Sequence, residues 1–155
     1  MTIEIPNYKN ITITDIVCDY NGTIAKDGKV LPEIKTLFLE LSEYYTLHVI
    51  TADTFGSVIT QLEGYGAGIK ILVSSDHTQE KADFIATLGA GQCAAMGNGN
   101  NDSAMLKSAS IGIAVLGDEG CSKEALFAAD IVCQDSADAL ALFLEPKRLI
   151  ATLRR

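Results

Sequence analysis

The residues best suited to chemistry stand in four short polar clusters, each beside a predicted strand. The first cluster, Asp19 to Thr23, opens with a carboxylate, and Gly22 permits the tight backbone path that follows it. The N–H groups exposed after Gly22 are suited to holding phosphate oxygens. The second cluster, Thr51 with Ala52, offers a hydroxyl and backbone N–H groups at the end of another predicted strand.

The remaining two clusters supply positive charge and oxygen ligands. Lys81 stands in a predicted helix that is placed to reach the same edge of a sheet. Between Met96 and Asp102, two glycines and four oxygen-bearing side chains occur within seven residues, just before another predicted helix. Oxygen-rich loops of this kind favour a hard cation, so this segment is a candidate Mg²⁺ site.

Each cluster taken alone also has an ordinary structural explanation. An Asn-Gly pair usually forms a turn, and Thr51 is a suitable cap for the helix predicted after it. A lysine such as Lys81 is usually solvated, and Asp102 suits the positive end of a helix dipole. A shared site is favoured by the joint order, because all four clusters stand at the ends or flanks of the predicted strands.

Strand-like and helix-like segments alternate along the chain. Apolar segments predict strands at 15–19, 46–51, 69–74, 93–96, 111–115 and 131–133. Helical spacing predicts a helix that opens at Pro32 and further helices at 55–62, 79–88, 102–108, 122–129, 137–144 and 147–153. A short hairpin is expected at 24–31, where Asp27 and Gly28 form the turn.

This β-α order predicts an α/β fold, a three-layer sandwich with helices on both faces of a parallel sheet. Ligands of such sheets bind beyond the carboxyl ends of the strands, where the strand order reverses. The four polar clusters are therefore expected to meet at that edge. The chain shows no linker, low-complexity tract or internal repeat, and we expect residues 1–155 to form a single domain.

Composition narrows the function classes. The chain has 155 residues, 48% of them apolar, which is enough to bury a substantial core. Its formal net charge of -8 argues against nonspecific binding to nucleic acid or to an anionic membrane surface. A signal peptide and a membrane span are not predicted, so a cytoplasmic protein is expected. Four cysteines without CxxC spacing favour buried free thiols over a zinc site.

The ordered clusters resemble the motifs of the haloacid dehalogenase superfamily, most closely the phosphorylation domain of P-type ATPases. The D-x-D-G-T or D-K-T-G-T motif appears as Asp19 to Thr23, the strand-end Ser or Thr as Thr51, and the lysine as Lys81. The G-D-G-x-N-D motif appears as Gly97 to Asp102. The resemblance runs from Asp15 to about Cys133 and implies a Rossmann-like sheet.

The resemblance implies a phosphatase or phosphotransferase that acts on a small phosphorylated substrate and forms an aspartyl phosphate on its own nucleophile. The implied catalytic residues are Asp19 as nucleophile, with Asn21, Thr51 and Lys81. The implied phosphate-binding residues are Gly22, Thr51, Ala52, Lys81 and Asn101. The implied Mg²⁺ ligands are Asp19, the backbone carbonyl of Asn21, Asn98 and Asp102.

Two residues depart from the motifs of the phosphatases. Asn21 stands where these enzymes carry an Asp that serves as general acid and base, and an amide does not transfer protons. Asn98 stands where an Asp commonly binds the metal directly. We therefore expect weak Mg²⁺ binding and slow hydrolysis of the phosphoenzyme, unless Asp53 or another carboxylate acts as the base.

The spacing leaves no room for a cap domain. Between Asp19 and Thr51 only the hairpin and one helix fit, so we expect an open site, which a homo-oligomer would cover. A catalytically reduced domain that binds phosphate or a regulatory partner is the main alternative. A receiver domain with a strand-end Asp is a third reading, but the Gly-Thr that follows Asp19 and the Gly-Asn-Gly at 97–99 argue against it.

Overall fold

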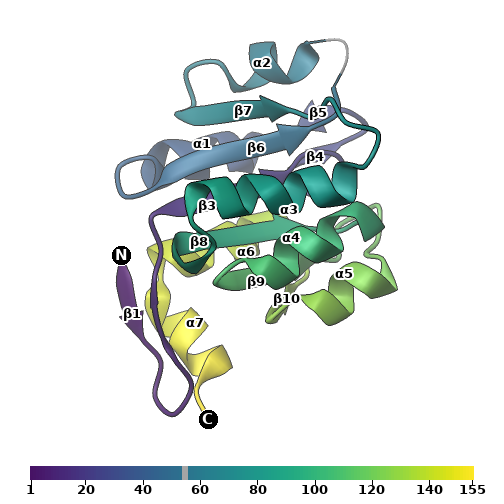
Figure 1. Cartoon of the computed structure of the whole chain (residues 1–155). Helices are drawn as coiled ribbons and strands as arrows, with labels where there is room; N and C mark the ends of the chain where they lie inside the picture. The colour runs from purple at the N-terminus through teal and green to yellow at the C-terminus, as the bar shows by residue number, and fades with distance from the viewer. Residues whose placement is uncertain (54–55) are drawn as a thin grey trace.

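The centre of the molecule is a six-stranded parallel sheet in the order β10-β9-β8-β3-β6-β7 (Figure 1). The computed structural model describes residues 1–53 and 56–155. The strands are β3 (Asp15–Asp19), β6 (Thr46–Thr51), β7 (Ala67–Ile71), β8 (Cys93–Gly97), β9 (Ile111–Val115) and β10 (Ile131–Cys133). Since β3 pairs with β6 on one side and with β8 on the other, the strand order reverses beside β3.

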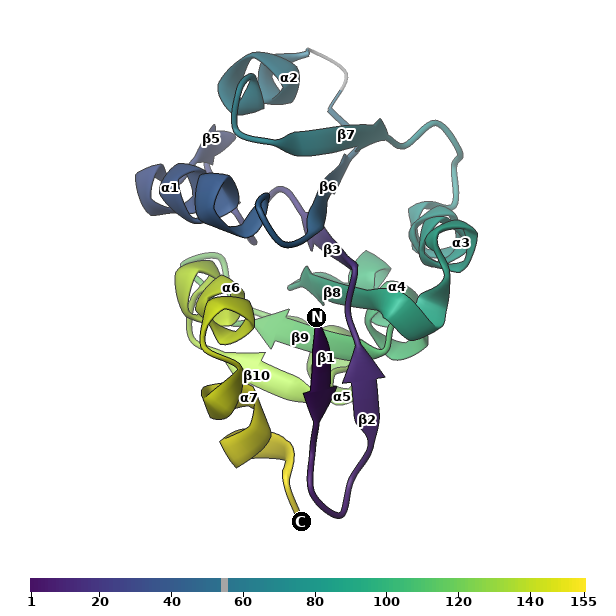
Figure 2. The same ribbon diagram turned by 90° about the vertical axis from the view of Figure 1, so that its left-hand side faces the viewer.

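Helices cover both faces of this sheet, as the β-α order predicts. One face carries α1 (Pro32–Leu41), α6 (Ser136–Leu144) and α7 (Pro146–Leu153) (Figure 2). The other face carries α3 (His77–Leu88), α4 (Ser103–Ser108) and α5 (Lys123–Ala128). The helix α2 (Ser57–Leu62) lies beside β7 at one end of the sheet. The predicted three-layer α/β fold is confirmed.

Alternating side chains of the central strand form the core on both faces. In β3, Ile16 and Cys18 pack in the apolar cluster beneath α1 and α6, whereas Val17 packs in the cluster beneath α3 and α4. Burial on both faces explains why β3 reads as a nearly continuous apolar run. Asp19 ends that run, so its carboxylate leaves the core at the carboxyl edge of the sheet.

A hairpin near the N-terminus was not predicted. The strands β1 (Thr2–Glu4) and β2 (Asn10–Thr12) pair antiparallel, apart from the main sheet, and bury Ile3 and Ile11. Strands of three residues in a polar setting give little periodic signal in a sequence. The predicted hairpin at 24–31 is confirmed as β4 (Ala25–Lys26) and β5 (Lys29–Val30).

The predicted strand 69–74 was wrong at both ends. β7 runs over Ala67–Ile71, because Ile71 is its last residue paired with β6. Beyond it, the N–H groups of Val73 and Ser74 donate to the Glu80 carboxylate, so this segment is a loop tied to the next helix.

Several helix starts differ from prediction. Helices α5, α6 and α7 begin one residue from the predicted positions, and the starts of α3 and α4 matter most because they lie beside the polar clusters. Helix α3 begins at His77, not Gln79, because Oδ1 of Asp76 accepts from the Gln79 N–H at 3.0 Å and caps the helix earlier. Helix α4 begins at Ser103 after a 3₁₀ turn that contains Asp102. The start predicted for the helix 55–62, at Phe55, lies outside the described residues.

The segment between β3 and β6 consists of the β4–β5 hairpin and α1, so this connection carries no cap domain. In the part of the chain that the structure describes, none of the helices combines the length and apolar character needed to cross a bilayer.

Candidate active site

The predicted polar clusters meet at the carboxyl edge of the sheet. Residues after β3, β6 and β8 and the start of α3 enclose a cavity of about 250 Å³ there. It is lined by Asp19, Asn21, Thr51, Ala52, Leu72, His77, Lys81, Asn98, Gly99 and Asn101. Most of these were predicted as site residues, so the sequence order did indicate a spatial cluster.

The floor of this cavity, as we name the set Asp19, Lys81 and Asp102, is a buried ion cluster. Nζ of Lys81 donates to Oδ1 of Asp19 and to Oδ1 of Asp102, each at 2.6 Å. The Lys81 side chain is 2% exposed and that of Asp102 is 0% exposed, whereas Asp19 keeps 11% exposure toward the cavity. A buried lysine held between two carboxylates is fixed in place and is not a solvated surface residue.

The floor holds one ammonium for two carboxylates. The pKa of the Asp19 carboxyl is raised to about 6, first by burial and then by the negative charge of Asp102, although Lys81 opposes both effects. Burial lowers the pKa of the Lys81 ammonium, but the two carboxylates outweigh burial and the pKa is raised. Lys81 therefore stays charged, and the cluster carries an excess negative charge once Asp19 ionises.

Asp102 also shapes the loop that follows β8. Its Oδ2 accepts from the N–H of Asn98 at 2.9 Å and from the N–H of Gly99 at 2.8 Å. A Cβ at Gly97 would lie 2.5 Å from Cγ of Asp102, so only glycine lets the strand end this close to the carboxylate. Both oxygens of Asp102 thus have protein donors, and its role as a cation ligand stays a prediction.

A second contact joins the loops after β3 and β8. Oγ1 of Thr23 lies 3.2 Å from Oδ2 of Asp19 and 3.2 Å from Oδ1 of Asn98, while Nδ2 of Asn98 donates to the Gly120 carbonyl. Gly22 adopts a φ of 76°, and a Cβ there would lie 2.5 Å from Nδ2 of Asn98. Gly22 is therefore required by both backbone conformation and space, and it stands behind the cavity wall.

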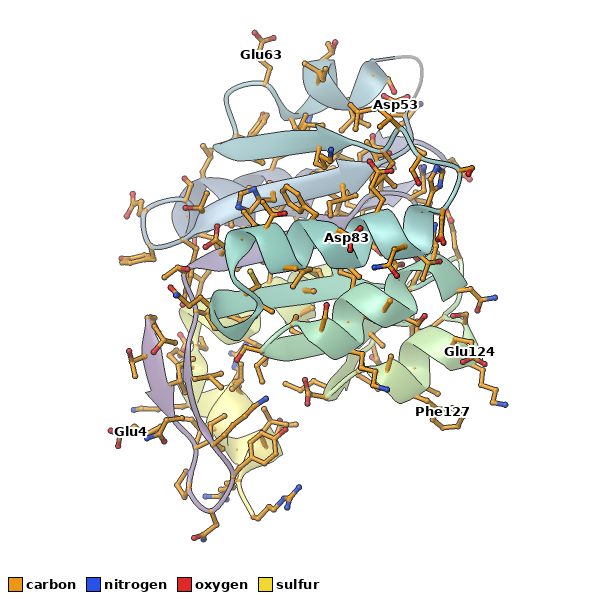
Figure 3. The ribbon with its side chains drawn as sticks, in the orientation of Figure 1. Glu4, Asp53, Glu63, Asp83, Glu124 and Phe127 are labelled. Atoms are coloured by element: carbon orange, nitrogen blue, oxygen red, sulfur yellow. The ribbon has the colours of Figure 1, made fainter. Side chains whose placement is uncertain are left out.

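The loop after β6 contributes Thr51 and Ala52 to the lining. Thr51 is 3% exposed, and its Oγ1 accepts from the N–H of Asp53 at 3.2 Å. Oδ2 of Asp53 accepts from the N–H of Val58 at 3.0 Å and from the Ser57 hydroxyl at 3.3 Å. Figure 3 shows Asp53 beside α2, so this carboxylate belongs to the start of that helix and is not part of the lining.

The structure adds His77 to the site, a residue that sequence reasoning missed. His77 and Lys81 are four residues apart in α3 and therefore share one face of the helix. The signal that would have found His77 is the cap at Asp76, which places the first turn of the helix two residues earlier than predicted.

The donors at this edge are oxygens, which suit a hard cation such as Mg²⁺. The Thr23 hydroxyl has a single proton, so it satisfies only one of the two oxygens that converge on it from Asp19 and Asn98. Among the described residues, no three His, Cys, Asp or Glu side chains are grouped so as to hold a metal ion. The set fits Mg²⁺ in chemistry, but few of its oxygens carry a negative charge.

Comparisons with known proteins show which sequences and folds this chain is similar to. No family model matches the chain. An uncharacterized protein of Methanocaldococcus jannaschii is 52% identical over 60 residues, which span 39% of this chain and 64% of that protein.

Among solved structures, the chain is similar to 3-deoxy-D-manno-octulosonate 8-phosphate phosphatase from Moraxella catarrhalis, determined with magnesium, phosphate and the sugar acid. The TM-score is 0.73 at 18% identity, over 92% of this chain and 94% of that one. A putative haloacid dehalogenase superfamily hydrolase of subfamily III A from Legionella pneumophila gives a TM-score of 0.69 at 18% identity, over 90% and 87% of the two chains. The chain has the haloacid dehalogenase fold.

The fold also matches part of a pump. A zinc-transporting PIB-type ATPase in its E2.Pi state gives a TM-score of 0.64 at 22% identity, over 79% of this chain but 20% of the ATPase. The haloacid dehalogenase fold implied by the sequence motifs is therefore confirmed.

Proposed function

We propose that this chain is a Mg²⁺-dependent phosphatase that forms an aspartyl phosphate on Asp19. The observation that supports this most strongly is the buried lysine at the carboxyl edge, because Lys81 contacts Asp19 and Asp102 at 2.6 Å each. A protein gains little stability from burying three charges, so such a cluster in a cavity indicates chemistry.

In the first step, an oxygen of Asp19 attacks the phosphorus atom and the bond to the leaving oxygen breaks. Lys81 holds Asp19 in position and offsets the charge of the phosphoryl oxygens. Thr51, Ala52 and Asn101 line the same cavity and supply polar groups to those oxygens. Phosphoryl transfer depends mainly on positioning and charge neutralisation, which this set provides.

Asp19, the backbone carbonyl of Asn21 and Asn98 would hold Mg²⁺, which when bound offsets the charge of both the carboxylate and the phosphoryl group. Asp102 supports this arrangement by fixing the backbone of Asn98 and Gly99. The excess negative charge of the floor favours uptake of a cation.

The substrate we propose is a small phosphorylated compound. The cavity of about 250 Å³ accommodates a phosphoryl group and little else, so the rest of the substrate lies in the open mouth. The connection between β3 and α1 contains only the short β4–β5 hairpin, which is too small to act as a cap over the cavity. We therefore propose that a second subunit covers the mouth.

A second candidate function is supported by the two amides. Asn21 and Asn98 replace the carboxylates that serve proton transfer and metal binding in the motif, which favours a domain that binds phosphate or a partner without turnover. The complete floor favours the enzyme, because a binding domain has no need of a nucleophile.

Labelling separates the two. Incubation with Mg²⁺ and a radiolabelled phosphoryl donor should give acid-stable label in the wild type and none in Asp19→Asn, which keeps the shape of the side chain. Wild-type-like label in Asp19→Asn would disprove the assignment of the nucleophile.

Beryllium fluoride provides a check that needs no turnover. As a mimic of the aspartyl phosphate, it should raise the melting temperature of the wild type only when Mg²⁺ is present. Absence of both label and this response would favour the binding domain.

A further inference from the structure

We propose that His77 is the proton-transfer group of this site and takes the part that Asn21 cannot play. This inference rests on the proposed function, since it needs a phosphoryl group on Asp19. It is carried by the position of His77 in α3 and by the composition of the cavity lining.

His77 belongs to the stripe of α3 that faces the sheet. His77, Lys81 and Ile85 stand at intervals of four residues, and such residues lie above one another on a helix. Ile85 is fully buried in the core, and Lys81 reaches Asp19. Asp83 lies on the opposite side of the helix and points away from the sheet (Figure 3).

Along this stripe, His77 stands at the mouth of the cavity. Lys81 is buried at the floor, whereas His77, one turn nearer the helix start, is half-buried. A leaving group points away from the nucleophile, and the water that later cleaves the aspartyl phosphate enters from the open side. Both reacting oxygens therefore pass the mouth, where His77 lines the wall.

Three of the described residues that line the cavity are titratable: Asp19, His77 and Lys81. Of these, His77 is the one to which the proposed phosphoryl transfer assigns no role. Asp19 is the nucleophile, and Lys81 is held in two ion pairs. Asp53, the carboxylate considered above as a possible base, lies outside the lining and accepts from the N–H of Val58. Imidazole changes charge between about pH 5 and 8, which suits it to give and take a proton at neutral pH.

The two half-reactions balance through His77. In the first, Asp19 forms a bond to phosphorus, the bond from phosphorus to the leaving oxygen breaks, and protonated His77 gives its proton to that oxygen. In the second, neutral His77 takes a proton from water as the water oxygen bonds to phosphorus. The bond from phosphorus to Asp19 then breaks, which releases phosphate and restores both side chains.

The charged groups near His77 have partners of their own. Asp76, the cap of α3, accepts from the Gln79 N–H. Glu80 accepts from the N–H groups of Ser74 and Val73, and these bonds lower its pKa, as do the nearby charges of Lys70 and His77. Across the cavity, the other charged groups of the lining are Asp19 and Lys81, which pair with each other. Removal of the imidazole should therefore change the shape of the pH profile of turnover.

The chain offers a matched control, since it contains two histidines. His48 lies at the other end of the sheet, where Nε2 is 2.7 Å from Oδ1 of Asp15. His77→Gln should lower turnover of an alkyl phosphate by about 10²-fold. His48→Gln should leave turnover unchanged. The pH profile of turnover should change shape in His77→Gln and keep its wild-type shape in His48→Gln.

Leaving-group chemistry makes the test specific. A p-nitrophenolate leaves without a proton, so phosphoryl transfer to Asp19 from p-nitrophenyl phosphate should be nearly unaffected in His77→Gln. Transfer from an alkyl phosphate should fall sharply. Adding Asn21→Asp to His77→Gln should restore much of the loss, because the new carboxylate can do the same work.

Three outcomes would overturn the proposal. Equal losses on both donors with an unchanged pH profile would give His77 a structural role only. Full activity of His77→Gln would give it none. Absence of acid-stable label in the wild type would overturn the proposed function together with this inference, whereas the first two outcomes leave Asp19 as the nucleophile.

Discussion

The floor and the rim of the cavity are built differently. The floor, Asp19, Lys81 and Asp102, is buried, and its members contact one another at 2.6 Å. The rim, by which we mean Asn21, His77 and Asn98, is exposed or half-buried. The floor matches the motifs of the haloacid dehalogenase superfamily residue by residue, whereas Asn21 and Asn98 depart from them.

This difference separates two tasks of the site. In the function we propose, the floor positions Asp19 and balances charge, and each member depends on the others because a lone buried charge is costly. In the same proposal the rim supplies protons and metal ligands, and its members are not needed to balance the buried charges. Substitutions in the floor should therefore change both stability and activity, whereas those in the rim should act mainly on activity and have smaller effects on stability.

The largest expected effect comes from Lys81→Met. It would leave Asp19 and Asp102 buried without a counter-charge, which costs about 3–5 kcal/mol in unfolding free energy. Labelling of Asp19 should be lost as well. Urea unfolding at pH 7 measures the first effect. Lys107→Met, at an exposed position of α4, should change neither.

Addition of Asp19→Asn to Lys81→Met should recover part of the lost stability, because one buried carboxylate is then removed. If the double variant were no more stable than Lys81→Met, the floor would not be limited by charge balance.

Asn21→Asp tests the rim without touching the floor. A positioned acid–base group is worth about 10²–10⁴-fold in rate, and His77 already supplies part of this, so we expect a gain of about 10²-fold or less in turnover of the aspartyl phosphate. A chase of labelled enzyme measures the decay directly. Unchanged decay would mean that proton transfer at this position does not limit the reaction, and stability should not change in either case.

Asp19→Asn separates stability from activity in the floor. The pKa of Asp19 is raised to about 6 by burial and by Asp102, so the folded protein binds more protons than the unfolded chain between about pH 4 and 6. Wild-type stability should therefore fall as pH rises through this range. At pH 7, Asp19→Asn should be more stable than the wild type by on the order of 2 kcal/mol, while being inactive.

That gain should shrink as the pH falls toward 4 and vanish near pH 3, where Asp19 is mostly protonated in both states because the pKa of an aspartate in an unfolded chain is about 3.9. Unfolding curves at pH 7 and near pH 3 measure it. Equal stability of the two proteins at pH 7 would show that Lys81 alone satisfies both carboxylates.

The fold and the meeting of Asp19, Thr51 and Lys81 at one end of the sheet could be predicted because both depend on order along the chain. Asp19, Thr51 and Lys81 were found by their positions relative to strands and helices, and these positions determine where side chains meet at a sheet edge. The contacts of Asp102 were not predicted, because a carboxylate in an oxygen-rich loop suits a metal as well as backbone N–H groups. His77 was not predicted as a site residue because the helix was expected to begin at Gln79, which left His77 in a loop. In the structure Asp76 caps the helix, and α3 begins at His77.

The smallest expected effect is a change in metal affinity from Asn98→Asp. A carboxylate in place of an amide adds one charge to the oxygen donors, and we expect Mg²⁺ to bind about tenfold more tightly by calorimetry. Without metal, the same substitution should destabilise the folded protein. Position 98 loses its donor to the Gly120 carbonyl. It would also face Glu119, since Oε2 of Glu119 and Nδ2 of Asn98 both lie within 3 Å of the point where Gly22 would carry a Cβ.

Metal-free Asn98→Asp should therefore melt at a lower temperature than the wild type and gain more on addition of Mg²⁺. Asn100→Asp is the matched control, because it adds the same charge to the same loop at an exposed position. It should leave both melting temperatures and the affinity nearly unchanged, since exposed charges are screened. If both variants tightened binding equally, general attraction would explain the effect and Asn98 would not be a ligand. If neither did, the metal would sit elsewhere, and the contrast between a complete floor and a reduced rim would apply to proton transfer alone.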